Sequence, residues 1–120
     1  MSAECLLASK RLLDEKCHRG SVNRSYYAAY CAISGLLPPA MKFGNRSNPP
    51  HERVKELVTK TLKMPQFVGK SRRFQMAKRF NYLRMTRVDA DYKPGVRIDR
   101  SEALQCLHIA IFICRTLGVE

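Results

Sequence analysis

An arginine at the end of an apolar stripe is the first feature of this sequence that could do chemistry. Three apolar residues recur at the spacing of one helical face, at Met76, Phe80 and Leu83. The next position on that face is Arg87. Because a buried charge without a partner is costly, Arg87 must pair with a carboxylate or open into a cleft, and Asp89 and Asp91 are the nearest carboxylates. The structural alternatives are an arginine that extends into solvent at the helix end and one that forms only a local ion pair with an aspartate.

Basic residues are concentrated around this arginine. The chain of 120 residues has 22 Lys+Arg and 10 Asp+Glu, a formal charge of +12. The segment 70–100 contains ten basic and three acidic residues, which leaves +7 in about a quarter of the chain. Seven of the ten are arginine, whose planar guanidinium suits phosphate. We expect this segment to attract polyanions without reading their sequence; the alternative is a solvated helix face.

The periodicity predicts an all-α protein in which helices position these groups. Helices are expected over 2–20 and 21–37, the first ending near Gly20, the second capped by Ser21 and stopped by Pro38. Further helices are expected over 51–63, from 71 to about 87, and over 100–117, with a connector at 89–99. Strand patterns are nearly absent. We expect a single domain over residues 1–120, an antiparallel bundle of four to five helices.

Two of these segments carry further expectations. The segment from Pro38 to Pro50 holds four prolines and no periodicity, and is expected to be a mobile loop. The helix predicted over 100–117 is apolar on most of its circumference, so it is either central to the bundle or shared with a partner chain.

Composition excludes several classes of protein. A hydrophobic share of 45% disfavours intrinsic disorder, and 120 residues are too few for a repeat array or a two-domain nucleotide enzyme. The longest nearly uncharged run, from Ala28 to Met41, is interrupted by Gly35 and two prolines, so no transmembrane helix is expected. The first ten residues contain Glu4 and no apolar segment of signal-peptide length, and we therefore expect a cytoplasmic protein.

The five cysteines are expected to be free thiols. Their number is odd and none falls in a CxxC pair, so neither disulfides nor structural zinc is expected. Cys31, Cys106 and Cys114 lie in apolar stretches, where free cysteine behaves as a small buried hydrophobe.

Two segments form a pattern when they are read together. The first is VNRSYYAAYCA at 22–32, continuing to Leu36 and Leu37. The second is RVDADY at 87–92, followed by Lys93 and Pro94. In this order and spacing they resemble the aromatic second helix and the later signature of the HEPN domain family (higher eukaryotes and prokaryotes nucleotide-binding). With the closing amphipathic helix, the resemblance spans residues 2–117.

The resemblance implies a fold, an activity and partners. The family pattern places an Arg, then four to six residues, then a His, in a cleft where two subunits meet. Arg87 matches the Arg, and Tyr92, preceded by Asp91, stands at the His position. Similar members include metal-independent endoribonucleases that act as toxins or in defence against phage, often neutralised by a nucleotidyltransferase encoded beside them. The resemblance therefore implies a HEPN-like homodimer that acts on RNA without a cofactor and is paired with a nucleotidyltransferase antitoxin.

The expected catalytic residues are Arg87, Asp91 and Tyr92. Cleavage of RNA without a metal needs a group that activates the 2′-hydroxyl and a cation that stabilises the phosphate transition state. Arg87 can supply the cation. Imidazole titrates near a pKa of about 6.5 and phenol near about 10, so a tyrosine at the His position is a poor base, and Asp91 or Asp89 could serve instead.

A second set of residues is expected to bind RNA or to line the cleft. Arg24 and Tyr27 share one face of their helix and could lie beside Arg87, whereas Tyr26 faces the core. Tyr27 could instead be a core residue with its hydroxyl at an edge. The remaining expected binding residues are Arg84, Asp89 and Lys93. Outside the motif lie His18, His51 and His108. The last of these is expected in the core or at an interface.

Two other functions fit the same sequence. A helical module without catalytic activity could bind a nucleotidyltransferase partner or a nucleotide, with Tyr92 as the acceptor of nucleotidyl modification, and the absence of the family's His favours it. A helix-turn-helix DNA binder would need a short turn, for which Gly20 and Ser21 are candidates. The helix after that turn offers only Arg24 as a basic residue, which disfavours this third function.

Overall fold

The described part of the chain consists of four α-helices and one short 3₁₀ helix. The computed structural model describes residues 2–36, 51–54 and 69–118. Its elements are α1 (Ser2–Asp14), α2 (His18–Ser34), η1 (His51–Arg53), α4 (Lys70–Tyr92) and α5 (Arg100–Thr116). No strand occurs in these ranges, which confirms the all-α expectation. The loop predicted at 38–50 lies outside the described residues, as does most of the helix predicted over 51–63.

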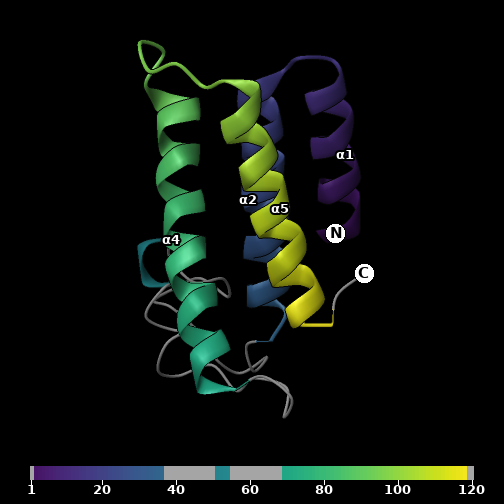
Figure 1. Ribbon diagram of the computed structural model, residues 1–120, viewed down its shortest axis with the longest axis vertical. Coiled ribbons are helices and arrows are strands. Elements are labelled where there is room, and N and C mark those ends of the chain that lie inside the picture. Colours follow the sequence, from purple (N-terminus) through teal and green to yellow (C-terminus); the bar gives the residue numbers. More distant parts are fainter. Residues whose placement is uncertain (1, 37–50, 55–68, 119–120) are drawn as a thin grey trace, which may run out of the picture.

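Helix α2 is the central element of this arrangement, because it packs against α1, α4 and α5. Helices α4 and α5 run in opposite directions, as do α1 and α2 (Figure 1). The six largest of the fully buried side chains in the described residues come from α2, α4 and α5, and are Tyr26, Ile33, Met76, Phe80, Leu83 and Ile113. Helix α5 contacts α1, α2 and α4, which accounts for its broad apolar surface. None of the described helices is long and apolar enough to cross a membrane.

The boundary between the first two helices differs from the prediction. Helix α1 ends at Asp14, and Lys16 takes a left-handed conformation with φ 63°, so α2 already begins at His18. Gly20 therefore lies inside a helix and does not end one. A Cβ atom at Gly20 would lie 3.3 Å from Leu12 Cδ1, so its lack of a side chain allows α2 to approach α1 closely.

Ser21, predicted as a helix cap, belongs instead to a buried cluster of three serines between α1 and α2. Ser9 Oγ donates a hydrogen bond to the carbonyl oxygen of Ser21 at 2.9 Å. The same atom lies 2.9 Å from Ser21 Oγ and 2.7 Å from Ser25 Oγ. All three residues are fully buried, so their hydroxyl groups depend on one another for hydrogen bonds.

Helix α4 continues beyond its predicted end near Arg87, up to Tyr92, and the connector to α5 begins only at Lys93. The last carbonyl groups of a helix lack partners within the helix, and Arg19 of α2 provides them here. Its Nη1 donates to the carbonyl oxygens of Asp89 (3.2 Å), Ala90 (2.9 Å) and Lys93 (3.2 Å), and its Nη2 to those of Pro94 (3.3 Å) and Val96. A tertiary contact thus extends the helix by more than a turn.

The five cysteines are not joined in disulfides, and their burial differs. Cys106 and Cys114 are buried, and burial raises the pKa of these thiols to about 12 and about 11. Cys31 is only half-buried, so the expectation of burial holds for two of the three cysteines in the apolar stretches.

Candidate functional site

Arg87 belongs to α4, and its side chain contacts Tyr27 of α2 as well as Asp91 and Tyr92 of its own helix. The residue is only 9% exposed. Its Nε donates to Asp91 Oδ2 at 2.9 Å, and its Nη2 donates to the hydroxyl oxygens of Tyr27 at 3.1 Å and Tyr92 at 3.5 Å. The carboxylate partner that the sequence required is therefore Asp91, one helical turn further along α4.

Aromatic rings surround the guanidinium of Arg87. Its central carbon Cζ lies 5.2 Å from the ring centroid of Tyr26 and 5.4 Å from those of Tyr27 and Tyr92. The faces of aromatic rings attract a cation, and more strongly when water is displaced from it. The rings and Asp91 together hold a nearly buried positive charge in a fixed position.

Helix α2 contributes an amide and a second arginine to the same site. Asn23 Nδ2 donates to Asp91 Oδ2 at 2.9 Å, and Arg24 Nε donates to Asn23 Oδ1 at 3.0 Å. Arg24 also lies over the ring of Tyr27, with 5.8 Å between Cζ and the centroid. Of the two α2 residues predicted beside Arg87, Tyr27 contacts it directly, whereas Arg24 is connected to it indirectly, through Asn23 and Asp91 and through the ring of Tyr27.

We refer to Asn23, Tyr27, Arg87, Asp91 and Tyr92 as the Arg87 cluster. The cluster is open to solvent on one side, because Tyr92 is 67% exposed. Both hydrogen bonds to Asp91 fall on Oδ2, so Oδ1 is the oxygen that can accept a further proton. The described contacts of Arg87 use Nε and Nη2, and Nη1 can still donate to a ligand. A cation, a carboxylate and an accessible phenol therefore share one surface edge.

An aromatic group lies behind the cluster, away from solvent. Tyr26 is fully buried, and its ring packs against those of Tyr27, Tyr30 and Phe80. Its hydroxyl is hydrogen-bonded to Nδ1 of His51, whose ring stacks on Tyr30 with 4.5 Å between centroids. Burial raises the pKa of Tyr26 well above that of an ordinary phenol, although the charge of Arg87 acts in the opposite direction. Tyr26 is therefore a neutral supporting residue, as the sequence predicted for a core position.

The other predicted residues lie outside the Arg87 cluster. Asp89, the alternative base, pairs with Lys93 at 3.3 Å on the exposed side of α4, so both point away from the cluster. Arg84 is half-buried one turn before Arg87, and its charge also lowers the pKa of the Tyr26 hydroxyl. His108 is exposed on α5, so the core position, one of the two places expected for it, is wrong.

Three residues of the site were not predicted from the sequence. Arg19 and Asn23 precede Tyr27 at four-residue steps on one face of α2, and this spacing was a signal that could have revealed them. His51 reaches the aromatic group from a segment that is distant in the sequence, and no local pattern indicates its position. Within the described residues, no group of three or more His, Cys, Asp or Glu side chains is arranged to hold a metal ion.

Comparisons with protein-family models, curated proteins and solved structures find no match to this chain.

Proposed function

We propose that this chain is a HEPN-type protein that cleaves RNA without a metal ion, as a cytoplasmic homodimer that serves as a toxin or defence component paired with a nucleotidyltransferase antitoxin. The observation that carries the proposal is the Arg87 cluster, in which a nearly buried guanidinium is held against a carboxylate at 2.9 Å beside an exposed phenol. The HEPN-like fold and the family relationship are part of the proposal and rest on the sequence resemblance.

The cluster contains the groups that such a cleavage requires. The 2′-hydroxyl oxygen of RNA attacks the neighbouring phosphorus, and Asp91 takes its proton. The bond from phosphorus to the 5′-oxygen breaks, that oxygen takes a proton from Tyr92, and a 2′,3′-cyclic phosphate remains. Arg87 stabilises the additional negative charge on the phosphate oxygens through Nη1. Asp91 is a better candidate for the base than Asp89, because Asp91 contacts Arg87 directly and its Oδ1 carries neither of the two described hydrogen bonds, whereas Asp89 pairs with Lys93 outside the cluster.

An exposed apolar stripe on α4 supports the homodimer. Phe74, Met85 and Tyr92 are all exposed, and they are separated by 11 and 7 residues, which are close to whole numbers of helical turns. They therefore lie along one side of the helix, and the stripe ends at the Arg87 cluster. Contact between two copies along this stripe would cover apolar surface and bring two clusters together.

The exposure of Tyr92 also favours a second candidate function, a binding module without ribonuclease activity. Its hydroxyl oxygen lies 3.5 Å from Nη2 of Arg87, a cation that can orient a phosphate. In this function a nucleotidyltransferase partner supplies a nucleoside triphosphate. The Tyr92 oxygen attacks the α-phosphorus, the bond from the α-phosphorus to the bridging oxygen breaks, pyrophosphate leaves, and the phenol proton is released to water.

The deciding experiment measures RNA cleavage in excess EDTA by the wild-type protein and by Arg87→Lys, Asp91→Asn and Tyr92→Phe variants. Arg97→Lys, an exposed residue of the connector, is the matched control. We expect cleavage by wild type and control and a loss of at least about 100-fold in Arg87→Lys, the usual range for removal of a transition-state donor. Arg87→Lys keeps the positive charge, so we expect the variant to fold. Circular dichroism measures its helix content and light scattering its oligomeric state, and wild-type values of both would assign the loss of activity to chemistry.

Three outcomes would count against the ribonuclease. Equal activity of wild type and Arg87→Lys would exclude the Arg87 cluster as the active site. Cleavage that disappears on addition of EDTA would exclude the metal-independent mechanism. If no RNA is cut, and mass spectrometry finds a nucleotidyl group on Tyr92 after co-expression with a nucleotidyltransferase encoded beside it, the second candidate function replaces the first.

A further inference from the structure

A shallow groove runs between α4 and α5, apart from the Arg87 cluster. It consists of two adjoining hollows of about 470 and 530 Å³, and His108 lines both. No residue of the Arg87 cluster lines either hollow. The groove extends along α4 from Arg72 to Tyr82, ten residues, or about 15 Å of helix. It is therefore a second surface feature with a composition of its own.

The charge of this groove has one sign. Four cationic side chains line it: Arg72, Lys78, Arg79 and Arg115. Among the described lining residues none is acidic, and none of the four cations forms an ion pair with a described residue. The groove therefore gathers positive charge without a neutralising partner in the described part of the chain, and attracts an anionic ligand.

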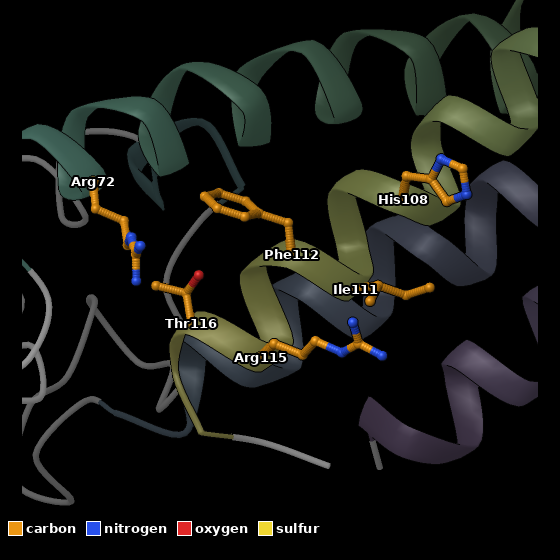
Figure 2. A pocket seen from close by; sticks show the side chains of 6 residues that line it. All are labelled: Arg72, His108, Ile111, Phe112, Arg115 and Thr116. Atoms are coloured by element: carbon orange, nitrogen blue, oxygen red, sulfur yellow. The ribbon is translucent and has the colours of Figure 1, made fainter.

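Aromatic side chains lie among these cations. Figure 2 shows the ring of Phe112 projecting from α5 toward α4, and Arg72 reaching from the first turn of α4 toward Thr116. The guanidinium carbon of Arg79 lies 4.5 Å from the centroid of the Phe112 ring. Tyr82 lines the other end of the groove, where its hydroxyl donates to Gln105 Oε1 at 3.4 Å. The groove thus offers an aromatic ring for stacking as well as cations for phosphates.

The two ends of the groove differ in the charge of the side chains around them. Burial raises the pKa of Tyr82, and the nearby charges of Glu102 and Asp99 raise it further. Acidic side chains therefore lie near the Tyr82 end, whereas Arg72 and Arg115 lie at the opposite end. The end with Phe112 is the one that favours an anion.

We infer that the α4–α5 groove binds a single-stranded segment of RNA, with phosphates on Arg72, Arg79 and Arg115 and a base stacked on Phe112. Single strands use cations and aromatic faces together, whereas the bases of a duplex stay stacked on one another. Two copies of this chain that met at the groove would bring its four cations against one another. An acidic peptide would match the cations and leave the ring unused. The choice of RNA rests on the proposed function, but binding in the groove does not depend on chemistry at Arg87.

The test measures fluorescence anisotropy of a labelled single-stranded 2′-O-methyl oligonucleotide, which lacks the 2′-hydroxyl required for cleavage. The Arg72→Gln/Arg115→Gln pair removes two cations from the groove. The Arg11→Gln/Arg97→Gln pair removes two exposed cations elsewhere and gives the same net charge. We expect the groove pair to weaken binding about 10-fold or more, and the control pair less than about 3-fold. The slope of log affinity against log salt should fall by about 1.4 for two lost phosphate contacts.

Stacking is tested by Phe112→Leu, which keeps an apolar side chain. Loss of base stacking should weaken binding at least about 5-fold and leave the salt slope unchanged. The inference is overturned if wild type does not bind, if the two charge pairs weaken binding equally, or if poly-glutamate or duplex RNA of equal length binds as tightly as the single strand.

The same assays distinguish failure of the groove from failure of the proposed function. Binding by wild type that depends on the groove pair, without any cleavage, would retain the groove and reject the ribonuclease. If cleavage is lost in Arg87→Lys, and the groove pair and the control pair bind the oligonucleotide equally well, the proposed ribonuclease stands and the proposed RNA site in the groove is rejected.

Discussion

Removing only one partner of the ion pair between Arg87 and Asp91 should destabilise the folded protein strongly, whereas replacing both partners by apolar residues should change its stability little. Asp91→Ala leaves the guanidinium of Arg87 without its carboxylate. Breaking a fully buried pair in this way costs about 3–5 kcal/mol. Here the side chains of Arg87 and Asp91 are 11% and 22% exposed, so water compensates in part. Removal of an acid from the last turn of α4 also recovers a few tenths of a kcal/mol. We expect a net loss of about 2–3 kcal/mol.

The double variant Arg87→Met/Asp91→Leu removes both charges and keeps the volume of the site apolar. Replacement of a buried ion pair by hydrophobic residues is often neutral or stabilising. We therefore expect its free energy of unfolding to lie within about 1 kcal/mol of wild type. At about 4 °C per kcal/mol for a domain of this size, the melting temperature should fall by about 8–12 °C in Asp91→Ala and by no more than about 4 °C in the double variant.

Thermal unfolding followed by circular dichroism measures this difference, at one fixed protomer concentration because a dimer melts in a concentration-dependent way. If the double variant is as unstable as Asp91→Ala, the pair is needed for folding and the reasoning fails. If it is as stable as wild type but inactive on RNA, the charges are present for function.

Three further predictions follow from other contacts. Arg19→Ala should lower the melting temperature by at least about 8 °C. The carbonyl groups at the end of α4 lose charged hydrogen bonds of about 1.5–3 kcal/mol each, which water replaces only in part. A decrease of less than about 2 °C would contradict this role. Stability should decline above about pH 9 in urea titrations, because the thiols of Cys106 and Cys114 titrate near that pH when unfolded, but at about 12 and 11 when folded. The unfolded state then releases protons that the folded state retains, and Cys106→Ala should make the decline shallower. Met85→Glu should make the protein monomeric in light scattering, and a dimer of unchanged affinity would exclude the α4 stripe as the interface.

The sequence predicted best what depends on neighbouring residues. The apolar periodicity located α5 to within one residue at each end, and the stripe that ends in Arg87 indicated the need for a carboxylate partner. Asp91 meets that need at a spacing of four residues within the same helix. Tyr26 is buried as its helical face predicted.

The failures involve contacts between distant segments. The end of α4 was predicted too early because the hydrogen bonds that extend it come from Arg19, about 70 residues away in the sequence. His51 reaches Tyr26 by a similar long-range contact. Ser21 has a side chain that suits a helix cap, and only the packing of α1 shows that its hydroxyl is needed elsewhere.

The three buried serines between α1 and α2 have a consequence for the opposite side of α2. A slip of α1 by one turn, about 5.4 Å, would separate these hydroxyl groups, and an unsatisfied buried polar group costs about 1–3 kcal/mol. Ser21 and Ser25 are each two residues from Asn23, roughly half a turn of helix, so they and the Arg87 cluster lie on opposite faces of α2. The orientation of α2 about its axis, which presents Asn23 to Asp91, is thus fixed by α1 on the opposite face, although α1 contributes no residue to the cluster. A substitution in α1, at Ser9 for example, could alter the reactivity of the site without touching it.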